Sequence, residues 1–97
     1  MNRDSVADLE PMSEAMAMRF AQIAQAQLNS TWGLSELGIA GPTGAPYGVS
    51  AGTSVIAISG PNPLATTVIT GHNRRQSNMW HFAEAAIALL ARALELD

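Results

Sequence analysis

The residues best suited to bind a ligand lie in a glycine-rich stretch between two apolar segments. Residues 38–52 read GIAGPTGAPYGVSAG, with five glycines and two prolines. Glycine permits positive φ and close approach of another group to the backbone, while proline fixes φ, so this stretch is expected to hold one shape. Shaped loops at strand ends bind ligands in α/β proteins, but a long ordered surface turn has the same composition. Both interpretations remain open.

A second polar group precedes the last apolar segment. His72, Arg74 and Arg75 lie in the stretch TGHNRRQSN, residues 70–78. If a helix starts here, an arginine beside its free N–H groups suits a phosphate or another anion. The alternative for both arginines is a solvated helix start that opposes the helix dipole. We expect no second histidine or carboxylate near His72. A turn histidine without such a partner usually has no chemical role; the alternative is that His72 contacts a ligand.

Other polar side chains lack the partners that chemistry requires. No general base is identifiable for the hydroxyl groups of Thr43, Ser50 and Ser54, so we assign no nucleophile among them. Glu36, before the loop, either orients a ligand or faces solvent, and His81 is expected to be packed or partly exposed. Because the chain has no cysteine and no metal-type histidine spacing, we predict neither a metal site nor a cofactor.

The composition excludes several classes of function. The 97 residues carry a net charge of -3, which disfavours nucleic acid and anionic membranes as partners. No lysine is present, so the chain supplies no lysine base, Schiff base or P-loop lysine. No apolar run approaches the ~20 residues of a transmembrane helix, and the acidic, polar N-terminus does not resemble a signal peptide. We therefore expect a soluble, cytoplasmic protein.

Apolar periodicity predicts the elements that position these residues. After a leader at 1–11, expected to be disordered or loosely attached, one domain is expected over 12–97. Its predicted order is α-β-loop-β-β-α: helix 13–28, strand 32–37, strand 53–59, strand 65–70 and helix 73–96. Ser13 suits the N-cap of the first helix. The strand at 53–59 is expected to be buried on both faces and to form a hairpin with the next strand.

Each predicted helix has an apolar stripe that is expected to face the sheet. In the first helix the stripe consists of Met12, Met16, Phe20, Ile23 and Ala24. In the last helix it consists of Met79, Phe82, Ala83, Ala86, Leu89, Leu90 and Ala93. Two helices against three strands indicate an α/β or α+β layer, and the apolar strands look like part of a larger sheet.

Several separated motifs resemble the C-terminal part of the CinA family, the competence-damage-inducible proteins whose characterised activity is nicotinamide-nucleotide amidohydrolase. These motifs are GIAGPTG at 38–44, Tyr47-Gly48, TSVIAISGP at 53–61 and TGHNRRQSNMW at 70–80. The similarity covers Met12 to Leu94. It implies a three-layer α/β/α domain whose first strands and catalytic segment precede the region seen here, so the domain is expected to be incomplete.

The resemblance also implies how the family acts on its substrate. Catalysis is attributed to a serine in a Glu-Ser-Cys-Thr-Gly-Gly turn, assisted by a downstream tyrosine and lysine. The chain has neither that turn nor a lysine, and Tyr47 lies in a different motif. No catalytic residue is therefore assigned.

The part of the family pattern that does carry over concerns binding. The family's Thr-Gly-Ile-Ala-Gly-Pro loop corresponds to the run that starts at Leu37, and the implied substrate-binding residues are Gly38, Ile39, Ala40, Gly41 and Arg75. Arg75 corresponds to the arginine of a Gly-Asp-Arg-type segment. Leu37 replaces the family's threonine, and the lost hydroxyl is expected to remove a hydrogen bond to the ligand.

Three interpretations of function follow from these motifs. The first is a CinA-like domain that hydrolyses nicotinamide mononucleotide to nicotinic acid mononucleotide and ammonia, inactive as this isolated chain. The second is a non-enzymatic relative that binds a nucleotide, forms a homo-oligomer or pairs with a chain that completes its sheet. The third is a truncated gene product without an independent role.

Overall fold

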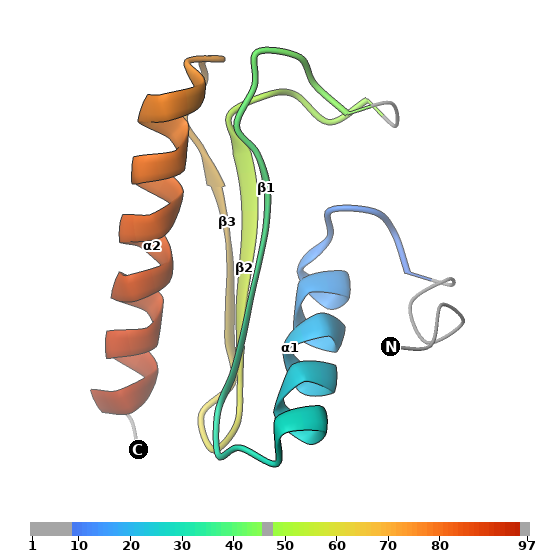
Figure 1. Ribbon diagram of the computed structural model, residues 1–97, viewed down its shortest axis with the longest axis vertical. Coiled ribbons are helices and arrows are strands. Elements are labelled where there is room, and N and C mark those ends of the chain that lie inside the picture. Colours follow the sequence, from blue (N-terminus) through green and yellow to red (C-terminus); the bar gives the residue numbers. More distant parts are fainter. Residues whose placement is uncertain (1–8, 46–47, 96–97) are drawn as a thin grey trace.

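Two helices pack on opposite faces of a three-stranded sheet in the computed structural model, which describes residues 9–45 and 48–95 (Figure 1). The elements follow the predicted order: α1 Glu14–Leu28, β1 Gly33–Ile39, β2 Thr53–Ser59, β3 Leu64–Ile69 and α2 Arg75–Glu95. The predicted three-layer α/β/α arrangement is confirmed. Most of the predicted leader, residues 1–8, lies outside the described residues.

The central strand β2 is antiparallel to both of its neighbours. Ile56 pairs with Glu36 of β1 and with Thr66 of β3. Every residue of β2 after Thr53 is buried, as predicted for a strand covered on both faces. The predicted hairpin of β2 and β3 is confirmed, and β1 forms a second hairpin with β2 through residues 40–52. The rule that ligands bind at the carboxyl ends of parallel strands therefore does not apply here.

Helix α1 covers one face of the sheet through small residues. Ala17 and Ala21 are fully buried against Val55 and Ala57. The predicted stripe of Met16, Phe20 and Ile23 was wrong in its phase, since these side chains are only half-buried beside that contact. A side chain on Gly33 would collide with the backbone carbonyl of Ala21, so α1 lies too close to β1 for large residues at the contact.

Both ends of α1 are fixed by hydrogen bonds of capping residues. The Ser13 Oγ accepts a hydrogen bond from the backbone N–H of Met16 at 3.1 Å, which confirms the N-cap. Asn29 ends the helix in the left-handed region, with φ of 50°, and its N–H bonds to carbonyls of the last turn. The first helix therefore begins and ends within one residue of the predicted bounds.

Helix α2 covers the other face of the sheet over β2 and β3. Its buried apolar residues are Phe82, Leu89 and Ala93, and the last two pack against Ile56 and Ile58. Part of the predicted stripe was wrong, because Met79 and Ala83 are exposed. Of the helices in the described parts of the chain, none is both long and apolar enough to cross a membrane.

Candidate functional site

The loop between β1 and β2 projects from the end of the sheet at which α2 begins (Figure 1). Asn78 joins these segments from inside and is fully buried. Its Nδ2 donates hydrogen bonds to the carbonyl oxygens of Ala40, at 2.8 Å, and His72, at 3.0 Å. Its Oδ1 accepts a hydrogen bond from the Thr70 hydroxyl. One side chain thus ties the end of β1 and the segment after β3 to the first turn of α2.

Two loop glycines permit this close arrangement. Gly41 has φ of 110°, and a Cβ there would lie 2.6 Å from the carbonyl oxygen of Asn73. Gly52 has φ of 90°, and a Cβ there would lie 2.5 Å from the carbonyl oxygen of His72. Both positions therefore require glycine for conformation and for space. The peptide bond between Gly41 and Pro42 is cis.

Arg75 connects the loop to a cavity between β1 and α2. Its Nη1 donates a hydrogen bond to the carbonyl oxygen of Gly41 at 3.1 Å. The cavity has a volume of about 340 Å³, and its lining residues are Glu36, Gly38, Ala40, Arg75, Met79, Phe82, Ala83 and Ala86. Gly38, Ala40, Gly41 and Arg75, all predicted to bind substrate, are thus brought together.

The other two positions named for this loop lie on the opposite face of the sheet. Side chains alternate between faces along a strand, so Leu37 and Ile39 of β1 point away from the side that carries Glu36 and Gly38. Leu37 packs against the cluster beneath α1. A threonine hydroxyl at position 37 would therefore also lie on the α1 side, and its absence removes no donor from the cavity.

Glu36 supplies the acidic side of the cavity. Partial burial raises the pKa of its carboxyl group, and the nearby Ser54 hydroxyl lowers that pKa in part. Ser54 pairs with Gly38 in the register of β1 and β2 and is fully buried. Its Oγ has no hydrogen-bond partner of normal geometry among the described residues. The solvent-facing alternative for Glu36 is thus only partly correct, since the carboxyl group also lines the cavity.

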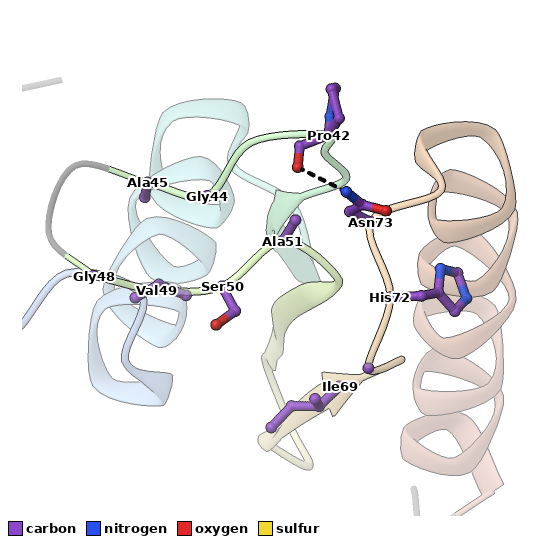
Figure 2. A pocket seen from close by; sticks show the side chains of 11 residues that line it. Pro42, Gly44, Ala45, Gly48, Val49, Ser50, Ala51, Ile69, His72 and Asn73 are labelled. Atoms are coloured by element: carbon purple, nitrogen blue, oxygen red, sulfur yellow. Dashed lines mark hydrogen bonds between the residues drawn. The ribbon is translucent and has the colours of Figure 1, made fainter.

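A second, more open hollow of about 910 Å³ lies on the other side of the loop (Figure 2). Its wall consists of loop residues and of Ile69, Gly71, His72 and Asn73. Asn73 Nδ2 donates to the Pro42 carbonyl oxygen at 3.4 Å. Figure 2 shows the His72 ring turned toward α2 and away from the loop. The hollow therefore offers backbone, the Ser50 hydroxyl and the Asn73 amide, but its described residues include no charged side chain that could recognise a charged ligand.

The two histidines of the chain lie near each other, which corrects the expectation that His72 has no histidine nearby. The ring centroids of His72 and His81 are 6.4 Å apart. His72 Nδ1 accepts a hydrogen bond from the backbone N–H of Arg74, an exposed residue. Removal from water lowers the pKa of His72, and electrostatic interactions with Arg74 and His81 lower it further. The described residues contain no cluster of three or more histidines or carboxylates that could hold a metal ion.

Comparison with protein-family models shows which known proteins this chain is related to. The model of the CinA C-terminal domain matches residues 1–94. The chain belongs to this family. No protein with a curated description matches the chain.

Solved CinA structures share its architecture. The competence/damage inducible protein CihA from Agrobacterium tumefaciens is 19% identical, with a TM-score of 0.81 over 95% of this chain and 57% of its own. A CinA superfamily protein from Klebsiella pneumoniae is 20% identical, with a TM-score of 0.74 over 97% and 59%. One from Escherichia coli is 24% identical, with a TM-score of 0.70 over 99% and 54%. The chain thus spans little more than half the length of these CinA proteins, and the likeness concerns the fold alone.

Proposed function

We propose that this CinA domain binds nicotinamide mononucleotide in the cavity between β1 and α2, with the phosphate on Arg75, and does not hydrolyse it alone. The position of Arg75 carries the proposal. A guanidinium has five N–H donors, and the bond to Gly41 occupies one of them. That bond also fixes the group at the cavity wall, so the remaining donors are oriented before a ligand arrives.

The other cavity residues suit the rest of a mononucleotide. Met79 and Phe82 supply apolar surface for the nicotinamide ring. Glu36 supplies an acceptor for ribose hydroxyl groups. A volume of about 340 Å³ lies at the lower end of the range for small-molecule sites.

Hydrolysis needs groups that this chain does not supply. A nucleophile must attack the carboxamide carbon while a base takes its proton, and ammonia must then leave. The chain has no lysine to act as that base. Ser54 is fully buried and cannot reach a substrate, although Glu36 lies beside it. We therefore expect binding without turnover from these 97 residues.

Thermal unfolding with and without nicotinamide mononucleotide tests the proposal. Ligand at 100 times its dissociation constant should stabilise the folded protein by about 2.7 kcal/mol. For a domain of this size, that energy corresponds to a rise in Tm of roughly 10–20 °C. Arg75→Ala should lose the shift. The matched control Arg74→Ala removes the same charge from an exposed neighbour outside the cavity and should keep the shift.

Two results would contradict the proposal. A folded wild-type protein whose Tm does not change would exclude binding. An equal shift in the Arg75→Ala protein would place the ligand elsewhere. Ammonia released from the nucleotide by the purified chain would refute the separate statement that it does not catalyse hydrolysis.

A further inference from the structure

The space above Gly38 is bordered by an acid and an aromatic ring. A Cβ added to Gly38 would lie 3.0 Å from both carboxylate oxygens of Glu36 and 3.0 Å from the Cδ2 atom of Phe82. The carboxylate and the ring edge thus border one point on the wall of the cavity between β1 and α2. The carboxylate, although partly in water, therefore turns back over the strand toward Phe82.

Gly38 keeps this space open although its backbone conformation does not require glycine. It lies within β1 and is not among the glycines with positive φ. At Gly41 and Gly52 an added Cβ would meet a backbone carbonyl oxygen, whereas at Gly38 the three nearest atoms belong to side chains. A glycine inside a strand often marks the close approach of a ligand or of another backbone. Since no backbone atom is among the nearest ones, the space suits a ligand.

We propose that Glu36 and Phe82 form a binding position for a planar organic cation, which in nicotinamide mononucleotide is the pyridinium ring. The proposal rests on the function proposed above, because it concerns the same ligand and the same cavity. The ring nitrogen of this nucleotide is bonded to the ribose, so the ring carries a positive charge. A carboxylate attracts that charge, and an aromatic ring also attracts a cation placed over its face. The position therefore selects the ligand by the charge of its ring.

The charges on the cavity wall match those of the nucleotide. Of the described residues that line the cavity, Glu36 is acidic, Arg75 is basic and the others are uncharged. Nicotinamide mononucleotide likewise has a cationic ring at one end and an anionic phosphate at the other. Partial burial raises the pKa of the Glu36 carboxyl group and the Ser54 hydroxyl lowers it in part, and neither influence is a positive charge. The phosphate would offset the charge of Arg75, and the ring would offset the charge of Glu36.

Calorimetric titration with the oxidised and the reduced nucleotide tests this selection. Reduced nicotinamide mononucleotide keeps the phosphate, the ribose and the carboxamide but has a neutral dihydropyridine ring. Opposite charges about 5 Å apart in a largely aqueous environment change affinity by about fourfold, so the wild type should bind the oxidised form tighter by at least that factor. Glu36→Gln should lose most of this preference. The matched control Glu84→Gln removes the same charge from an exposed residue of α2 outside the cavity and should keep the preference.

Gly38→Ala tests the position itself. The added Cβ occupies the space between the carboxylate and the ring, so this variant should bind the oxidised nucleotide more weakly than the wild type. Without ligand it should unfold at nearly the wild-type temperature, because the backbone at this position permits alanine. Unchanged affinity of the folded variant for the oxidised nucleotide would overturn the proposal.

The same titrations distinguish this selection from the proposed function. Binding that requires Arg75 but is equally tight for both forms of the ring would overturn the selection and leave the proposed function intact. A preference for the oxidised form that Glu36→Gln fully retains would place the selecting charge elsewhere, and would also overturn it. Absence of binding of either form to the wild type would overturn both proposals.

Discussion

Replacing Asn78 with alanine removes the side chain that joins three segments beneath the candidate site. Two carbonyl oxygens, of Ala40 and His72, lose their donor, and the Thr70 hydroxyl loses its acceptor. The Thr70 hydroxyl also lies 3.4 Å from the His72 carbonyl oxygen, so that oxygen keeps a weak donor, whereas the Ala40 carbonyl oxygen has no other donor among the described residues. A buried polar group left without a partner costs about 1–3 kcal/mol, and the lost side-chain volume adds to this cost.

We therefore expect Asn78→Ala to lower the free energy of unfolding by about 2–4 kcal/mol. For a domain of this size, Tm should fall by roughly 10–25 °C. Urea denaturation followed by circular dichroism measures the change, and the slope of free energy against urea should stay constant. Gln76→Ala, an exposed position in the same helical turn, is the matched control and should change stability by less than about 0.5 kcal/mol.

A second variant separates the hydrogen bonds from the volume. Asn78→Asp keeps the size of the side chain but removes both N–H donors and sets a carboxylate against two carbonyl oxygens. At pH 7 its loss of stability should equal or exceed that of the alanine variant. If neither Asn78 variant loses more unfolding free energy than Gln76→Ala, Asn78 does not hold this end of the sheet together and the reasoning is wrong.

Three further changes follow from the same structure. Glu36→Gln should raise stability at pH 7 by less than about 1 kcal/mol, because the exposed part of the carboxyl group is screened by water. Because the pKa of Glu36 is raised in the folded state, the wild type loses stability as pH rises through that pKa. The stability advantage of the glutamine variant should therefore vanish near pH 4. An advantage that is independent of pH would show that the carboxylate charge is not its cause. Gly52→Ala should lower the free energy of unfolding by about 2–4 kcal/mol. The control Gly48→Ala has a similar φ but nothing within 4 Å of the added Cβ, and should cost about 1 kcal/mol. Equal costs would refute the crowding at Gly52. Ser13→Ala should cost about 1 kcal/mol through the lost N-cap, and unchanged urea denaturation would argue against the cap.

Local signals were sufficient to predict the elements of this fold. The β-branched run at Thr53–Ser59 predicts a strand covered on both faces, and all but its first residue are buried. Ser13 and Asn29 mark the ends of α1 because each acts on backbone groups within a few residues of itself. Properties set by neighbours in the sequence are therefore the ones that sequence reasoning predicts well.

The phase of α1 and the role of Asn78 depend on contacts that are distant in sequence. Alanines at 17 and 21 form the contact because α1 approaches β1 closely at Gly33, which helical periodicity alone does not reveal. Asn78 looks like an ordinary polar residue of a helix start, and its partner at Ala40 is far away in the chain. The approach of His81 to His72 likewise depends on how the turn before α2 folds back.

The candidate site was predicted in part. The resemblance named the loop glycines and Arg75, and the structure adds Glu36, Met79 and Phe82 around the same cavity. These three residues belong to two elements whose facing sides become known only when α2 is placed over the sheet. Strand alternation between Leu37 and Gly38 is the one sequence signal that could have placed position 37 on the opposite face.

A binding cycle with two ligands and two proteins tests the central claim most directly. Calorimetric titration would compare nicotinamide mononucleotide with nicotinamide riboside, the same molecule without its phosphate, on the wild type and on Arg75→Ala. If the phosphate binds Arg75, its removal should weaken binding to the wild type by at least tenfold, about 1.4 kcal/mol, and should have little effect on the variant. An equal loss in both proteins would show that the phosphate does not contact Arg75, and no binding of either ligand to the wild type would refute the proposed function.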